Sequence, residues 1–179
     1  YLRRQAEEDR VAFLEAVKAG RVGLEGMYLN ELTGLCRPEE LIRLMSYATR
    51  MAALCGIVID SAMISDVPGY TWSTVTAMAQ AGVRYFSFAP NYFDRLGGTM
   101  VEWQNRPFWW KGADGRSRVL CWCPSRGYAL GHIIGDGEAL ARLIPSYLDE
   151  LEAKGYPYDL THLRWNVHGD NGSPDEKLA

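Results

Sequence analysis

The sequence predicts an α/β fold with a mostly parallel sheet built from βα units. Helical and strand-like patterns alternate along the chain, as expected where helices join parallel strands. Three helical segments stop at a glycine, namely Gly20, Gly56 and Gly82, and a strand-like segment follows each of them. The 179 residues, of which 47% are hydrophobic, are enough for one domain with its own core.

The first half of the chain contains two predicted helices and two predicted strands. Apolar residues at helical spacing predict a helix over residues 1–19, and the segment 22–29 has the pattern of a strand. Pro38 suits the first turn of a helix that runs to about residue 54, with acidic residues favourably placed near its N-terminus. The apolar run 57–59 is then predicted to begin another strand.

The second half adds further elements in the same alternating order. The turn-rich segment Gly112-Ala113-Asp114-Gly115 indicates a hairpin between two strand-like runs. The predicted elements are a helix over 72–81, strands over 83–88, 107–110 and 118–122, a helix over 137–153 and a strand over 163–167.

Both ends of the sequence lie within predicted helices. Residues 1–19 have helical periodicity from the start, and Ser173-Pro174-Asp175-Glu176 has the cap, proline and glutamate of a helix start shortly before Ala179. We therefore expect a single domain over residues 1–179 that is truncated at both ends and belongs to a longer protein.

Charge and composition exclude some classes of function. A net charge of -3 and a pI near 5.6 leave no basic face for a nucleic acid partner. No apolar run approaches the roughly 20 residues of a membrane span. The spacing of Cys36, Cys55, Cys121 and Cys123 matches no zinc knuckle and favours buried free thiols, hence a reducing compartment such as the cytoplasm. The localisation and the oligomeric state stay open, since an export signal would precede Tyr1.

Polar side chains follow most of the predicted strands. Because ligands bind at the carboxyl ends of parallel strands, this pattern indicates an active site. Each residue also has a simpler interpretation: Asp66 as a helix cap, Asp170 as a turn residue and Glu31 as a solvated loop residue. The residues at the strand ends are Asn30, Glu31, Asp66, Asn91, Arg126, Tyr128, His132, His168, Asp170 and Asn171.

Several motifs occur in the same order along the chain as in one known enzyme family. Ser65-Asp66-Val67-Pro68-Gly69-Tyr70-Thr71-Trp72 looks like the family motif that carries the catalytic aspartate. Asn30-Glu31-Leu32-Thr33-Gly34 precedes it, and Pro107-Phe108-Trp109-Trp110 and Val119-Leu120-Cys121-Trp122 follow. Gly169-Asp170-Asn171 stands where the family commonly has Gly-Asp-Asp. From about Gly26 to Leu178 the chain thus resembles the family 38 glycoside hydrolases, which include α-mannosidases.

This resemblance implies a fold, a metal and a set of site residues. The fold would be part of a seven-stranded β/α barrel, and the metal would be zinc that grips vicinal sugar hydroxyls. Asp66 would be both a zinc ligand and the nucleophile, while the acid/base would fall on Asp170 or Asn171. Tyr128 would lie near Asp66, and Asn30, Glu31 and Asn91 would line the carbohydrate site.

The chemistry suits these residue types. Retaining hydrolysis requires a carboxylate nucleophile and a carboxylic acid roughly 5 Å apart. A carboxylate also suits zinc in an open catalytic site. The sequence departs from the family pattern at Asn171, since an amide cannot act as a general acid, and at Tyr70, where many members have histidine. The other metal ligands would lie outside the chain, so we expect the isolated fragment to be inactive.

Two other functions remain open at this point. The first is a metal-dependent carbohydrate deacetylase on a related barrel, in which His168 and Asp170 would be the metal ligands. The second is a carbohydrate-binding domain that lost catalysis, which the amide at Asn171 favours.

Overall fold

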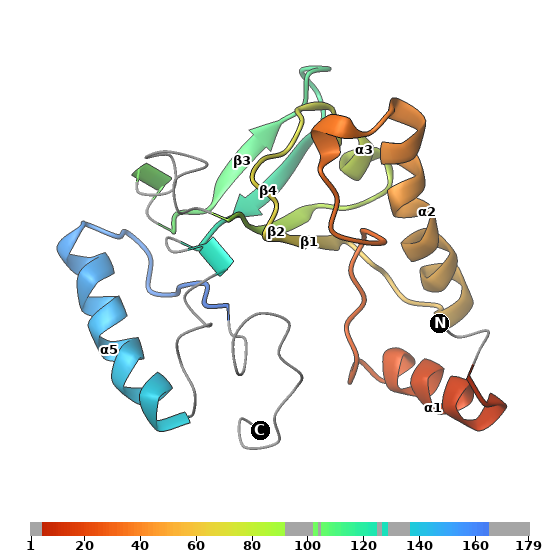
Figure 1. Cartoon of the computed structure of the whole chain (residues 1–179), viewed down its shortest axis with the longest axis horizontal. Helices are drawn as coiled ribbons and strands as arrows, with labels where there is room; N and C mark the ends of the chain where they lie inside the picture. Colours follow the sequence, from red (N-terminus) through yellow and green to blue (C-terminus); the bar gives the residue numbers. More distant parts are fainter. Residues whose placement is uncertain (1–4, 92–101, 104, 125–126, 129–136, 165–179) are drawn as a thin grey trace.

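A four-stranded sheet forms the centre of the fold in the computed structural model, which describes residues 5–91, 102–103, 105–124, 127–128 and 137–164. Its strands are β1 (Ser61–Ser65), β2 (Tyr85–Ala89), β3 (Phe108–Lys111) and β4 (Arg118–Trp122), in the order β1-β2-β4-β3 (Figure 1). β1, β2 and β4 are parallel, and β3 joins β4 in an antiparallel hairpin. The predicted α/β fold with a mostly parallel sheet is therefore confirmed.

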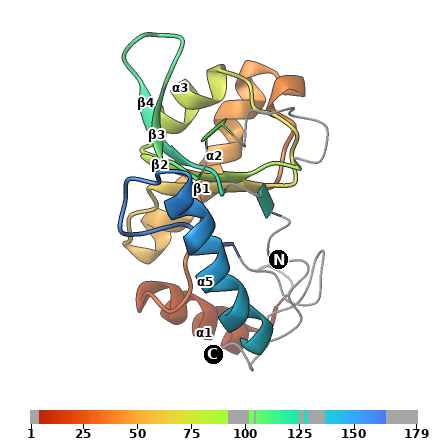
Figure 2. The ribbon, with the colours of Figure 1, turned by 90° about the vertical axis from the view of Figure 1, so that its left-hand side faces the viewer.

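The described residues also contain four α-helices, which pack around this sheet. They are α1 (Glu7–Lys18), α2 (Pro38–Cys55), α3 (Ser73–Gln80) and α5 (Gly137–Ala153), with a short 3-10 helix at Thr33–Leu35. Figures 1 and 2 show α3 on one side of the sheet, and α1 and α5 on the other side. Each α-helix lies where the sequence predicts one, within a few residues at its ends.

The ends of α2 show why this prediction succeeds. Pro38 occupies the first turn, and a Glu40 carboxylate oxygen accepts a hydrogen bond from the Arg37 backbone N–H at 2.6 Å. At the other end, Gly56 adopts a left-handed conformation with φ 67°, which costs glycine little.

The main core lies between the sheet and α3. Alternate residues of each parallel strand, such as Ile64, Phe86 and Cys121, point into it and are at most 1% exposed. Val75 and Met78 of α3 complete the layer. Burial raises the pKa of the Cys121 thiol to about 12, so this cysteine is a neutral, apolar core residue.

Asn105 ties the chain around α5 to the sheet. Its amide nitrogen lies 2.7 Å from both the Tyr147 hydroxyl of α5 and the Thr161 hydroxyl, and 3.1 Å from the His162 carbonyl. Its side-chain oxygen accepts a hydrogen bond of 2.6 Å from the indole nitrogen of Trp122 in β4. Asn105 is fully buried and has φ 59°, a conformation that asparagine tolerates better than most residues.

One predicted strand is wrong, and another begins later than predicted. Residues 22–29 form no strand, because the segment makes only one backbone hydrogen bond to β1, from Gly26 N to Ser61 O at 2.6 Å. Residues 57–59 precede the sheet, and Val58 is 83% exposed despite its β-branched side chain. β1 begins at Ser61. The carbonyl of the preceding residue, Asp60, accepts hydrogen bonds from the backbone N–H groups of Arg84 and Tyr85 at the start of β2.

Two further segments depart from the predictions. In the predicted strand 163–167, residues 163 and 164 are not in a strand, and 165–167 lie outside the described residues. In the first predicted helix, residues 5 and 6 precede α1 and residues 1–4 are not described.

Gly26 provides a test of how the segment 22–29 packs against β1. A Cβ at this position would lie 2.7 Å from Val83 Cγ2 and 2.9 Å from the Ser61 carbonyl oxygen. We expect Gly26→Ala to lower the free energy of unfolding by about 1–3 kcal/mol, since backbone must shift to admit the methyl group. Urea denaturation measures this change. Gly23→Ala is the control, because nothing lies within 4 Å of its Cβ, and an equal loss in both variants would contradict the packing.

Candidate active site

Asp66 stands at the carboxyl end of β1, directly after Ser65. Its backbone has φ 63°, in the left-handed region that aspartate tolerates better than most residues. The Asp66 backbone N–H donates to the Ala89 carbonyl at 2.8 Å, which continues the pairing of β1 with β2 by one residue. The turn thus leaves the exposed carboxylate at the edge of the sheet, where a ligand can reach it.

Asn91 connects Asp66 to Tyr128. Its side-chain amide nitrogen donates to Asp66 Oδ1 at 2.8 Å and lies 3.3 Å from the Tyr128 hydroxyl. The three residues follow β1, β2 and β4, the three parallel strands that are neighbours in the sheet. The structure therefore brings three of the predicted site residues together at the carboxyl edge of the sheet.

Asn30 and Glu31 occupy different positions relative to this group. The Asn30 side-chain oxygen accepts a hydrogen bond of 3.1 Å from the backbone N–H of Ser65, so Asn30 supports the end of β1. A carboxylate oxygen of Glu31 accepts from the Leu32 N–H at 3.1 Å, within its own loop. Asn30 thus contacts the residue that directly precedes Asp66, whereas Glu31 makes a local turn contact.

The remaining predicted site residues are outside the described part of the structure. They include the two candidates for the acid/base, Asp170 and Asn171, and the possible metal ligand His168. Arg126 and His132 are also outside it. Their roles stay predictions.

Arg164 is a residue of this region that the sequence analysis did not single out. Its guanidinium bonds the Ser65 hydroxyl and also donates to the Ser87 carbonyl at 2.7 Å and the Ser87 hydroxyl at 2.8 Å. It thereby cross-links β1 and β2 next to Asp66. Burial lowers the pKa of Arg164, and the nearby Tyr70, Cys123 and Glu25 partly offset this effect. The sequence signal that could have identified Arg164 is the presence of a charged residue within the otherwise apolar predicted strand 163–167.

Tyr70 also borders the site, although the sequence analysis noted it only as a departure from the family pattern. Its ring packs edge-on against Phe86 and Phe88, with centroid distances of 5.4 and 5.2 Å. Burial, followed by the nearby Cys123 and Asp66, raises the pKa of the Tyr70 phenol, although Arg164 opposes the shift. Tyr70 is therefore a neutral phenol, and its buried hydroxyl has no hydrogen-bond partner among the described residues.

The comparison with protein families connects this site to a known group of enzymes. The glycosyl hydrolases family 38 N-terminal domain matches residues 1–170. The chain belongs to this family. No curated protein matches the chain.

Solved structures of similar fold include two proteins from Enterococcus faecalis. An alpha-mannosidase from strain V583 has a TM-score of 0.60 and 19% identity, over 81% of this chain and 16% of that chain. A protein in glycosyl hydrolase family 38 has a TM-score of 0.58 and 18% identity, over 92% of this chain and 17% of that one. This family 38 chain therefore spans less than a fifth of either of these two proteins.

A third similar structure comes from an enzyme with a different name. It is a 4-alpha-glucanotransferase from Thermococcus litoralis, with a TM-score of 0.51 and 16% identity over 92% of this chain and 24% of that chain. At these identities the three structures show a shared fold.

The family implies zinc, so the donor groups around Asp66 bear on whether zinc fits. Among the described residues, no group of three or more His, Cys, Asp and Glu side chains is placed to hold a metal ion. A zinc site requires three or four protein ligands, and of the predicted ligands only Asp66 is described. The described part of this family 38 chain therefore does not form a zinc site by itself. In the same part of the chain, no helix has the length and apolar character needed to cross a membrane.

His162 lies beside Arg164 on the opposite face of the sheet from α3. Its Nε2 atom is 3.5 Å from the Ser87 hydroxyl, and its buried Nδ1 atom has no hydrogen-bond partner in the part of the chain that the structure describes. Burial lowers the pKa of His162 from 6.5 to about 4, and the charge of Arg164 adds to this effect.

We expect His162 to stay neutral in the folded protein at pH values where a free histidine is protonated. Because its folded pKa is depressed, its contribution to stability is fully present above pH 6.5 and is lost as the pH falls toward 4. NMR titration of the imidazole protons, assigned with His162→Gln, measures the pKa. A midpoint near 6.5 would contradict the burial of this ring.

Proposed function

We propose that the chain is part of the catalytic domain of a retaining, α-mannosidase-like glycoside hydrolase, and that Asp66 is its nucleophile. The observation that carries the proposal is the contact of Asp66 with Asn91, beside Tyr128, at the carboxyl edge of the parallel strands. Membership of family 38 and similarity to an alpha-mannosidase support it. In the full-length parent, the substrate would be a carbohydrate with a glycosidic bond.

The proposed fold of the parent is a seven-stranded β/α barrel. β1, β2 and β4 would be three of its adjacent parallel strands, and residues 1–179 would form one piece of this single domain. Active sites of such barrels form at the carboxyl ends of the strands, where Asp66 lies.

The hydrogen bonds of Asp66 suit a nucleophile. Oδ1 accepts the bond from Asn91, and no described residue donates to Oδ2. Oδ2 would attack the anomeric carbon while the bond to the leaving oxygen breaks, which forms a glycosyl ester. Asn91 holds the carboxylate so that its orientation is fixed before the sugar binds.

The leaving oxygen requires a proton, which the acid/base supplies. Asp170 has the required carboxylic acid, whereas Asn171 has none, so either Asp170 or a residue beyond this chain takes the role. In the second step the same group, now ionised, would deprotonate water. The water would attack the anomeric carbon, release Asp66 and leave the product with its original configuration.

Zinc in the parent would bind Asp66 together with ligands outside this chain. Bound zinc would orient vicinal hydroxyls of the sugar. Asn30, Glu31, Asn91 and Tyr128 would line the same site, with Asn30 supporting the strand end through the Ser65 N–H.

The rate of 4-nitrophenyl α-mannoside hydrolysis by the full-length parent with zinc tests the proposal. We expect Asp66→Asn to lower the rate by roughly three or more orders of magnitude, since it removes the nucleophile. Asp60→Asn is the control, because Asp60 lies at the other end of β1 and pairs with Arg84 at 3.4 Å. Retained turnover by Asp66→Asn would contradict the assignment of Asp66.

A further inference from the structure

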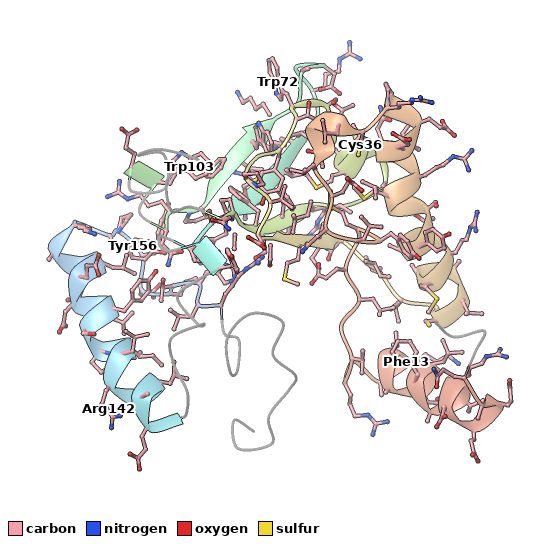
Figure 3. The ribbon with its side chains drawn as sticks, in the orientation of Figure 1. Phe13, Cys36, Trp72, Trp103, Arg142 and Tyr156 are labelled. Carbon is pink, nitrogen blue, oxygen red and sulfur yellow. The ribbon has the colours of Figure 1, made fainter. Side chains whose placement is uncertain are left out.

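A cavity of about 270 Å3 adjoins the candidate site on the α3 side of the sheet. Its walls are mainly aromatic and include Tyr70, Phe88, Pro90, Trp103, Phe108 and Trp110. The rings contact one another at centroid distances of 5.7 Å for Phe88 with Trp103 and 5.1 Å for Trp103 with Phe108. Trp103 lies beside β3 in Figure 3. Four of the lining residues, Tyr70, Phe88, Trp103 and Phe108, therefore form a connected set of aromatic rings.

The cavity is next to Asp66 in the fold. Tyr70 lies four residues after Asp66, and its phenol is close enough to respond to the Asp66 charge. Pro90, on another wall, immediately precedes Asn91, which donates to Asp66 Oδ1 at 2.8 Å. A molecule whose reacting bond lies at Asp66 is thus within reach of this cavity.

The chemistry of the walls limits what the cavity can hold. No Asp, Glu, Asn, Gln, Lys, Arg or His side chain is among the described lining residues, so the several hydroxyls of a sugar ring would lack partners. The buried Tyr70 hydroxyl, which none of the described residues bonds, can serve one polar atom of a ligand. An apolar cavity of about 150 Å3 holds a benzene ring, so this volume suits one ring with a short substituent.

We propose that this cavity binds the apolar aglycone, an aryl or cycloalkyl group, of the glycosides that are cleaved at Asp66. The inference rests on the proposed function, because an aglycone exists only for a glycosidase. It assigns Trp110 and Tyr70 to the recognition of the leaving group, whereas Asp66 and Asn91 act on the sugar.

Two alkyl glycosides separate aglycone binding from leaving-group reactivity. Methyl and cyclohexylmethyl α-mannosides release alcohols of similar acidity, so the ratio of their kcat/KM values reports binding of the larger group. For the full-length parent with zinc, we expect roughly a tenfold or greater preference for cyclohexylmethyl. We expect Trp110→Ala to bring this ratio close to one. Trp110→Phe keeps an aromatic ring at this position and should give an intermediate ratio. This variant replaces Trp110→Ala in the test if the alanine variant does not fold.

Trp109→Ala is the matched control for these variants. Trp109 is the neighbour of Trp110 on β3, is 51% exposed and lies outside the cavity with its ring under Arg118. We expect its ratio to equal that of the wild type. A wild-type ratio near one, or the same ratio in Trp110→Phe as in the wild type, would overturn the proposal. The proposal would also be overturned if Trp110→Ala lowered kcat/KM only for a mannose disaccharide, because that result would indicate that the cavity is a sugar subsite.

Binding of benzyl alcohol to the full-length parent tests the cavity without catalysis. Calorimetry should show at least roughly tenfold weaker binding to Trp110→Ala than to Trp109→Ala. If neither glycoside is hydrolysed but this difference is found, the proposed function fails and the cavity still binds apolar groups. Equal binding to both variants overturns the cavity itself, whatever the enzyme hydrolyses.

Discussion

The parallel pairing of β1 with β2 is the constraint on which the candidate site depends. The register aligns Ser65 with Ala89, and the Asp66 N–H extends the ladder to the Ala89 carbonyl at 2.8 Å. Because parallel strands end at the same edge, the residues that follow them are brought together whatever their separation in the sequence. Asp66 and Asn91 are 25 residues apart along the chain, yet their side chains are hydrogen-bonded.

The two faces of the sheet carry side chains of different polarity. The face toward α3 is filled by apolar side chains such as Ile64 and Phe86, and the aromatic cavity lies on this side. The opposite face carries the Ser65 and Ser87 hydroxyls, which bond the half-buried Arg164 guanidinium. A cation that is partly removed from water needs hydrogen-bonding partners, and the strand hydroxyls and the Ser87 carbonyl provide them for the two terminal nitrogens of Arg164. Arg164 on the polar face thus holds the ends of β1 and β2 together, while the apolar face forms the core.

Much of the fold could be predicted because its signals are local. Glycine stops, the cap of α2 and the turn of the β3–β4 hairpin depend on residues near each other in the sequence. The strand at 22–29 was predicted wrongly because an apolar pattern does not show whether a partner strand runs alongside, and Gly26 makes a single bond to β1. Pairing of this kind depends on distant residues, so periodicity alone cannot identify it.

The residues of the candidate site could be predicted where they directly follow a parallel strand, because ligands bind at the carboxyl ends of such strands. That rule identified Asp66, Asn91 and Tyr128, which the structure brings together. It missed Tyr70 and Arg164, whose positions depend on burial against other elements and not on a strand end. Asp170 and Asn171 lie outside the described residues, so the acid/base stays a prediction.

The central claim is that Asp66 forms a covalent bond to the sugar. A fluorinated α-mannosyl fluoride, which forms the glycosyl ester quickly and releases it slowly, would trap this intermediate in the full-length parent. Mass spectrometry of the digested protein should locate the added sugar on the peptide that contains Asp66. A label on another carboxylate, or a product of inverted configuration without any label, would contradict the account.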